Sequence, residues 1–142
     1  MPSYGSSISI VASREAVWRV LAEVVAWPKW LPTVSSVEPL DGRALKVGSR
    51  YAVRQPKLRP ATWVVTKFEP PRCFVWQARS PGLLLVAEHT VEESLPGKSQ
   101  VNLRFSFTGL LGVPIGLLFR SVTESYLSQE VASLKLEVEG RQ

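Results

Sequence analysis

The sequence predicts an α+β fold in which a curved antiparallel sheet of about seven strands wraps around a long C-terminal helix. Apolar residues alternate with a period of two through residues 34–109, as they do in half-buried strands. Turn-forming pairs such as Asp41-Gly42, Pro81-Gly82 and Pro96-Gly97 divide this stretch into consecutive strands. After Gly112 the pattern becomes helical.

The N-terminal part predicts one strand followed by two short helices. Residues 7–11 alternate, with Ile8 and Ile10 on one side. Ser13 suits a helix N-cap, and Glu15 places a negative charge in the first turn, where the helix dipole favours it. An apolar stripe at helical spacing follows in Val17, Trp18, Leu21, Val24 and Val25. Because Pro28 and Pro32 interrupt the next stretch, residues 27–31 form at most a short second helix.

The remaining strands are expected at about 34–40, 48–55, 61–69, 72–79, 84–94 and 100–109. The last is the clearest, because Val101, Leu103, Phe105 and Phe107 share one face and polar residues the other.

The long helix is expected from Pro114, in a first helical position, to about Glu139, which gives a length of roughly 39 Å. Its broad apolar face requires a large surface, and the six consecutive strands supply one. A strongly twisted sheet can curl around a helix, and the space between them need not be filled by side chains. We therefore expect an apolar ligand cavity there.

Length and composition predict a single domain over residues 1–142. The only cysteine, Cys73, allows no intrachain disulfide, and the first residues lack the pattern of a signal peptide. The longest apolar run, 110–119, spans about half the roughly 20 residues of a membrane helix. A cytoplasmic location is the resulting expectation.

The net charge of +5 is unevenly distributed, with nine basic residues between Arg43 and Arg79 against one acid, Glu69. Solvated outer faces of strands are the favoured interpretation, and an anionic ligand or acidic partner is the alternative. Tyr51 and Trp63 are interleaved with these charges and could stack bases. No nucleic-acid-binding module is present, however, so we predict no nucleic-acid partner.

Four segments resemble the START-like superfamily, which includes the polyketide cyclase/dehydrase and lipid-transport proteins and has a helix-grip fold. They are VASREAVWRVLA (11–22), WPKWLP (27–32), the Pro-Pro hairpin FEPPRCFVW (68–76) and the glycine-containing lead into the long helix (109–116). The resemblance runs from about residue 7 to 139. It implies a hydrophobic cavity under the long helix, but it carries no invariant catalytic residues.

His89 is the only histidine and the only candidate general base. If Val91 faces inward, the period of two places Leu85, Ala87 and His89 on the inner face as well. His89 would then be a base or a polar anchor for a ligand, and a purely structural histidine is the alternative. Glu88 and Thr90 would point the opposite way, so no neighbouring acid on this strand orients the ring.

The expected ligand-binding residues are mostly aromatic: Trp30, Tyr51, Trp63, Trp76, His89, Phe105, Phe107, Arg120 and Tyr126. Trp30 is placed near the mouth of the cavity, and Arg50 is a further candidate anchor. A buried arginine needs a counter-charge, so an inward Arg120 would indicate an acidic ligand.

Neither a metal nor a cofactor is expected. One His and one Cys cannot form an ordinary zinc site, and no phosphate-binding loop or dinucleotide fingerprint is present. We therefore expect a module that binds a lipid-like, aromatic or polyketide-like molecule. The alternative is a polyketide cyclase or dehydratase with His89 as general base, and a homodimer stays open.

Overall fold

The computed structural model describes residues 2–141, so the outermost residues of the expected domain, 1 and 142, lie outside the described part. The elements in chain order are β1 (Ser3–Ile10), α1 (Arg14–Leu21), the 3-10 helix η1 (Val24–Lys29), β2 (Ser36–Pro39), β3 (Arg50–Arg54), β4 (Ala61–Glu69), β5 (Cys73–Ser80), β6 (Leu83–Leu95), β7 (Lys98–Thr108), α2 (Gly112–Leu118) and α3 (Arg120–Gly140).

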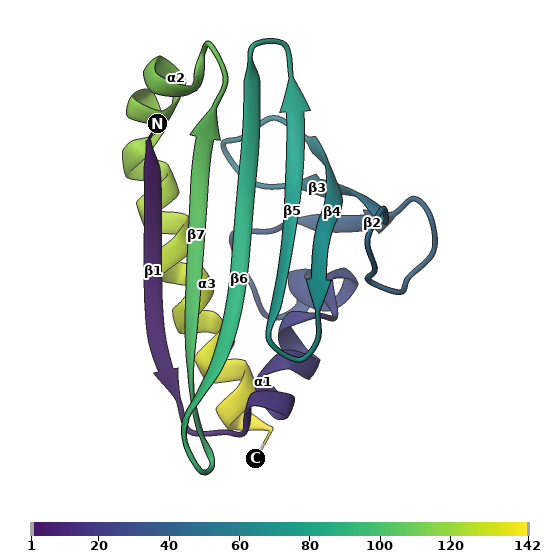
Figure 1. The fold of residues 1–142 in the computed structure, drawn as a ribbon, viewed down its shortest axis with the longest axis vertical. Coiled ribbons are helices and arrows are strands. Elements are labelled where there is room, and N and C mark those ends of the chain that lie inside the picture. Colours follow the sequence, from purple (N-terminus) through teal and green to yellow (C-terminus); the bar gives the residue numbers. More distant parts are fainter. Residues whose placement is uncertain (1, 142) are drawn as a thin grey trace.

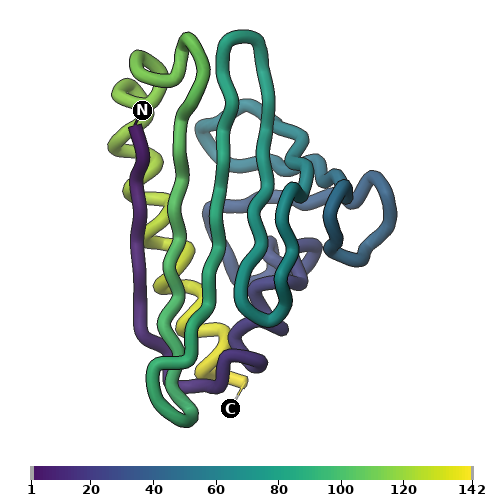
Figure 2. The backbone as a smooth tube through the Cα atoms, in the orientation of Figure 1, coloured from purple at the N-terminus to yellow at the C-terminus, as the bar shows by residue number. Residues whose placement is uncertain are grey.

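The seven strands form one antiparallel sheet in the order β1-β7-β6-β5-β4-β3-β2 (Figure 1). Each strand from β2 to β6 pairs with the next strand along the chain. At the other edge of the sheet β1 pairs with β7, and Ile8 lies opposite Val101. The sheet is strongly curved: β2 and β3 turn away from the plane in which β1, β7 and β6 run (Figure 2). The predicted fold class is confirmed.

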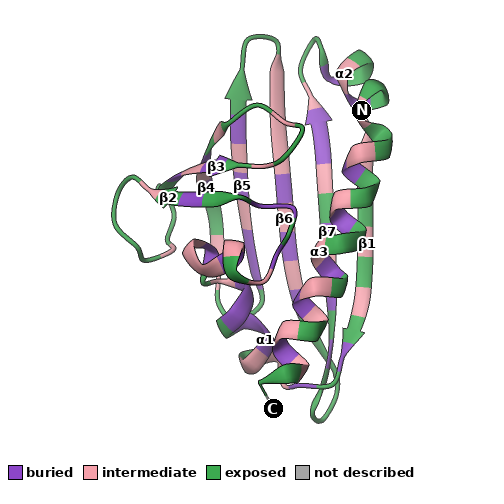
Figure 3. Cartoon of the chain, turned by 180° about the vertical axis from the view of Figure 1, so that it is seen from behind, coloured by how far each residue is buried: buried purple, intermediate pink, exposed green. Residues whose placement is uncertain are grey.

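Helix α3 lies on the concave face and packs mainly over the edge formed by β1 and β7, beside α1. Its buried residues are Thr123, Leu127, Val131, Leu134 and Val138, at the spacing of one helix face. Figure 3 shows this buried stripe turned toward the sheet and the exposed residues turned outward. Because α3 covers one edge of the sheet, other elements must cover the strands β4 to β6.

Those strands are covered by α1 and η1 through tryptophan side chains. The Trp18 ring lies 6.1 Å from Phe74, and the Trp27 ring lies 5.4 Å from Trp76. The indole nitrogen of Trp27 donates a hydrogen bond to the Leu21 carbonyl at 2.9 Å, which fixes the ring over the sheet. Ser13 caps α1 as predicted, since its hydroxyl accepts from the Ala16 amide.

The prediction of one continuous C-terminal helix is wrong. The helical segment begins at Gly112, two residues before Pro114, and is interrupted at Phe119, so that α3 alone is about 32 Å long. The Tyr4 hydroxyl donates to the Gly116 carbonyl at 2.8 Å, and a Cβ at Gly116 would lie 2.6 Å from Pro2. Contacts with the β1 end therefore hold α2 at Gly116.

Candidate functional site

His89 lies on β6 with its side chain on the concave face. The residues that alternate with it, Ala87 and Val91, are buried on the same face, so the predicted inward direction of this set is confirmed. Cross-strand pairing places His89 opposite Phe74, and the two rings stack with centroids 4.1 Å apart and planes 9° from parallel. The position of the imidazole therefore follows from the β5–β6 register.

Aromatic rings enclose the imidazole on the other sides. Trp27 and Trp76 lie 5.7 and 5.9 Å from it. Its Nδ1 is 3.3 Å from the Phe74 carbonyl oxygen, an acceptor to which an Nδ1–H can donate. In that tautomer the lone pair of Nε2 faces α3.

Glu130 on α3 faces His89. Its Oε2 lies 3.8 Å from Nε2, and the side chain is only 13% exposed. That separation is too long for a hydrogen bond, and Oε2 has no hydrogen-bond partner among the residues that the structure describes. A buried polar atom in this state is costly, so it marks a place where a ligand group would be stabilised.

Burial keeps both groups neutral near pH 7. Desolvation raises the pKa of Glu130 from 4.5 to about 8. The same cause lowers the pKa of His89 from 6.5 to about 4, against a smaller opposing effect of the Phe74 carbonyl. The pair is therefore a protonated carboxylic acid facing a neutral imidazole and not an ion pair.

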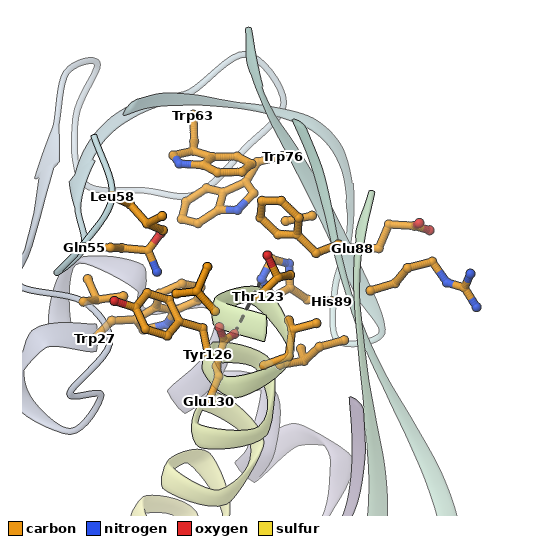
Figure 4. A pocket seen from close by; sticks show the side chains of 17 residues that line it. Trp27, Gln55, Leu58, Trp63, Trp76, Glu88, His89, Thr123, Tyr126 and Glu130 are labelled. Atoms are coloured by element: carbon orange, nitrogen blue, oxygen red, sulfur yellow. Dashed lines mark ion pairs between the residues drawn. The ribbon is translucent and has the colours of Figure 1, made fainter. Parts of the chain in front are cut away.

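The pair forms part of a small cavity between α3 and the concave face (Figure 4). Its walls include Trp27 from η1, Trp63 from β4 and Trp76 from β5, while Thr123 and Glu130 approach from α3. The free volume is about 70 Å³, below the roughly 300–1,000 Å³ of typical ligand pockets. The tryptophan side chains fill most of the space that the sequence analysis left open, and a ligand would have to displace some of them.

The outer side of the cavity is formed by the loop between β3 and β4. Gln55 and Leu58 of this loop line the cavity, and Tyr126 of α3 lies across from them (Figure 4). The Tyr126 hydroxyl donates a hydrogen bond to the Pro56 carbonyl, which ties the loop to the helix. Separation of these two groups would open the cavity.

Five of the nine residues expected to bind ligand line this cavity: Trp63, Trp76, His89, Phe105 and Tyr126. Three others support it from outside. Tyr51 is fully buried and packs on Trp76, Trp30 packs on Trp27, and Phe107 packs on Phe105 and Tyr4. These three contribute to the shape of the cavity through the rings that they contact.

The two arginines proposed as anchors do not reach the cavity. Arg120 is exposed and lies 3.5 Å from Glu124, one turn further along α3. Arg50 is also exposed and forms two hydrogen bonds with Asp41, which lower the pKa of that carboxyl group. The expectation of an inward Arg120 is wrong: this residue is the first of α3, before the buried stripe that begins at Thr123, and its side chain is 64% exposed. The argument for an acidic ligand loses its basis.

Glu130 is the functional candidate that the sequence analysis missed. On the strand that carries His89, the neighbouring acid Glu88 points away from the cavity, whereas Glu130 approaches from the helix (Figure 4). The helical spacing indicates that Glu130 lies on the apolar face, since it follows the buried Leu127 by three residues and precedes the buried Leu134 by four. An acid in the middle of an apolar helix face is a candidate for a buried functional group.

Cys73 does not complete a catalytic pair with His89. Burial raises the pKa of its thiol, and the charged groups that act on it are Lys67, Arg72, Glu69 and Glu88. Among the described residues, no group of three or more His, Cys, Asp or Glu side chains is arranged to hold a metal ion.

The fold and the cavity define a helix-grip protein with a small internal site lined by aromatic side chains. The chain belongs to the family described as polyketide cyclase/dehydrase and lipid transport, whose model matches residues 1–139. Comparison with curated protein sequences gave no match.

Solved structures with the same fold are distant in sequence. The Zhui aromatase/cyclase from Streptomyces sp. R1128 has a TM-score of 0.80 at 17% identity, with 98% of this chain and 94% of that chain covered. A START superfamily protein from Mycobacterium smegmatis has a TM-score of 0.75 at 14% identity, with 99% of both chains covered. Norcoclaurine synthase from Thalictrum flavum, in complex with dopamine and hydroxybenzaldehyde, has a TM-score of 0.76 at 11% identity, covering 99% and 87%. At these identities the likeness establishes the fold.

Within residues 2–141, none of the helices combines the length and the apolar character needed to cross a membrane.

Proposed function

We propose that this protein binds a neutral aromatic or polyketide-like molecule that carries a hydrogen-bond acceptor, in the cavity between α3 and the concave face. The observation that supports this most directly is the Oε2 atom of Glu130, which is buried without a hydrogen-bond partner among the described residues. Family membership supports a hydrophobic ligand in general.

The chemistry of the pair defines the preferred ligand. A protonated Glu130 can donate a hydrogen bond to a carbonyl oxygen, and the aromatic walls favour a flat, apolar body. Neither of the two candidate arginines would compensate a ligand carboxylate, since both are exposed and paired with acids, and Arg104, which lines the cavity, donates to the Ser3 hydroxyl. The ligand is therefore neutral.

Entry requires the loop at residues 55–60 to move away from Tyr126. Loops of this kind move on timescales far shorter than a binding experiment. The bound state would replace the packing of the tryptophan rings on each other with packing on the ligand, so the gain in buried apolar area is modest. We expect affinities in the micromolar range or weaker.

Three naphthalene derivatives provide a matched set of probes. 2-Acetylnaphthalene has a neutral carbonyl, 2-ethylnaphthalene lacks the acceptor, and 2-naphthoate carries a charge. Binding is measured by isothermal titration and by the fluorescence of the cavity tryptophans. We expect 2-acetylnaphthalene to bind at least about tenfold more tightly than the other two, the difference of one buried hydrogen bond. Tightest binding by 2-naphthoate, or no binding by any of the three, would contradict the proposal.

Variants of Glu130 test the role of its proton. For the wild type, the affinity for 2-acetylnaphthalene should fall by roughly tenfold in all as the pH rises past about 8, because only the protonated acid donates. Glu130→Gln keeps a donor that does not titrate, so its affinity should stay constant across this range. Glu124→Gln, on the same helix but exposed, is the matched control and should behave as the wild type.

A cyclase or dehydratase is the second candidate, favoured by the opposite displacement of the two pKa values within one pair. In a dehydration, His89 Nε2 would take the proton from the carbon next to a carbonyl. Glu130 would give its proton to the departing hydroxyl group, so that a C=C bond forms and water leaves. A pKa of about 4 makes His89 a weak base near pH 7, which is why binding is preferred. A β-hydroxyketone dehydrated by the wild type, and not by a His89→Asn variant that still binds it, would favour the enzyme.

A further inference from the structure

Helix α2 and the residue pair before it present apolar side chains to solvent. Leu110 is 93% exposed and Leu118 is 74% exposed, and Leu111, Val113 and Leu117 are exposed as well. Only the side of α2 that carries Gly116 is covered, by Pro2 and Phe107. The expected apolar stripe included Leu118, but the buried residues of α2 are Gly112 and Gly116, and Leu118, two residues after Gly116, lies on the opposite side of the helix. Most exposed leucines are isolated, whereas these form a group.

This group continues onto the tip of the β5–β6 hairpin. The Leu111 amide donates to the Gly82 carbonyl at 2.8 Å, and a Cβ at Gly82 would lie 3.1 Å from the Leu111 side chain. The two segments lie at the same end of the molecule, opposite α1 (Figure 1). We refer to residues 81–83 and 110–118 together as the apolar tip.

The charges that flank the apolar tip are positive. Arg79 precedes the hairpin turn and Arg120 follows α2; both are exposed, and Arg120 also forms an ion pair with Glu124 at 3.5 Å. Residues 79–83 and 108–120 contain no Asp or Glu. The neighbouring loop adds the exposed Lys57 and Arg59, and the hydrogen bond between Tyr126 and Pro56 ties this loop to the second turn of α3. An apolar surface bordered by arginine and lysine is complementary to an anionic lipid interface.

We propose that the apolar tip docks on the surface of an anionic lipid bilayer, with the leucines at the boundary of the acyl chains and the arginines among the phosphates. A second copy of the chain is a poorer occupant. A stable protein interface uses about 20–30 residues and buries about 800 Å² on each partner, whereas the apolar tip comprises twelve residues. Symmetric pairing of two tips would also bring their arginines together.

Docking in this orientation has a consequence for the cavity. Tyr126 lies in the second turn of α3. Its hydrogen-bond partner Pro56 lies in the loop that carries Lys57 and Arg59, and the two residues form the outer side of the cavity. The cavity would therefore open near the bilayer, from which an apolar molecule could enter it. The docking surface itself does not depend on the cavity or on its ligand.

Cosedimentation with vesicles tests the proposal. The protein is mixed with vesicles of phosphatidylcholine alone, or with vesicles in which about a third of the lipid is phosphatidylglycerol, at low and high salt. We expect binding to the anionic vesicles only, weakened by salt. Leu118→Ser should lower the partition coefficient roughly tenfold. The matched control is Leu136→Ser, because Leu136 is 76% exposed but lies near the other end of α3. This control should bind as the wild type.

Reversal of a charge is the second test in the vesicle experiment. Arg79→Glu should lower the partition coefficient roughly tenfold, since each basic residue near an anionic surface contributes on this scale. Arg19→Glu, at an exposed position on α1 at the opposite end, should leave it unchanged.

Equal binding to both kinds of vesicle, or no binding to either, would overturn the proposal. Self-association that depends on Leu118, without vesicle binding, would assign the apolar tip to a second copy instead. Glu130→Gln should dock normally, which separates this result from the test of the cavity.

Discussion

At the scale of single residues, Glu130 defines the site. Its carboxyl group lies among aromatic rings, 3.8 Å from the Nε2 of His89, with no cation close enough to stabilise its charge. Desolvation is the only resolved cause of its raised pKa. The protein therefore stores an uncharged acid in its interior at neutral pH, as enzymes and ligand-binding sites do where a buried donor is needed.

The free energy of unfolding should fall as the pH rises from about 6.5 to about 8. The unfolded chain loses the Glu130 proton near pH 4.5, whereas the folded protein keeps it to about 8, so the folded state binds more protons in this interval. The slope is at most about 1.4 kcal/mol per pH unit. His89 has the opposite effect at lower pH, because its pKa falls from 6.5 to about 4 on folding and stability is lost as the pH drops between these values.

Urea unfolding of the wild type and of Glu130→Gln across this range measures the effect. The stability of the variant relative to the wild type should increase steadily from pH 6.5 to 8, since the amide does not titrate. Glu124→Gln should run parallel to the wild type. Parallel curves for the wild type and Glu130→Gln would mean that Glu130 is ionised in the folded protein.

At the scale of elements, the turn between β7 and α2 sets the position of α2. Gly109 has a φ of +94°, and a Cβ at this position would lie 2.7 Å from the Gly82 carbonyl oxygen. Glycine is therefore required twice, for its backbone conformation and for the close approach of the β5–β6 hairpin. The same contact holds the two parts of the apolar tip together.

Comparison of Gly109 with Gly97 separates the requirement for a positive φ from the requirement for close approach of the hairpin. Gly97 also has a positive φ, +74°, but a Cβ there would meet nothing within 4 Å. Gly97→Ala should cost about 1 kcal/mol of unfolding free energy through backbone strain alone. Gly109→Ala should cost about 1–3 kcal/mol more, because backbone atoms must also move apart. Equal losses in urea unfolding would show that the hairpin yields without cost.

At the scale of the whole molecule, α3 joins the edge of the sheet to α1. Its buried stripe packs on β1 and β7, and polar contacts fix its C-terminal half: Lys135 donates to the Ser9 carbonyl, and Glu139 accepts from the Val11 amide. This docking leaves the region between α3 and strands β4 to β6 free to form the cavity. The contacts of Lys135 and Glu139 with the end of β1 therefore help to fix the position of Glu130 relative to His89.

Leu134 is the centre of this docking and is fully buried. Leu134→Ala should reduce the free energy of unfolding by about 2–5 kcal/mol through lost burial and a cavity. Leu136→Ala, at an exposed position on the same helix, should change it by less than about 0.5 kcal/mol. Chemical denaturation of both variants checks the difference. A loss below about 1 kcal/mol for Leu134→Ala would mean that the helix is held mainly by its other contacts.

The sequence by itself determined the architecture, because strand and helix periods are local properties that each segment carries alone. The alternation around Val91 placed His89 on the concave face, and the turn pairs separated the consecutive strands, whereas the pairing of β1 with β7 was not among the predictions. Five of the side chains expected to bind ligand, four aromatic rings and His89, line the cavity.

Only the tertiary structure decided where the C-terminal helix breaks, which residues meet across the interior, and how much space is left there. Tyr4 and Pro2 cover the Gly116 side of α2 from more than a hundred residues away, so that the opposite side, which carries Leu118, faces solvent. Glu130 and His89 meet because α3 packs on β7, the strand next to β6, and the tryptophans fill the cavity because Trp27 of η1 packs on Trp76 of β5. These features depend on contacts between segments that are distant in the sequence, and the pattern of a single segment does not predict such contacts.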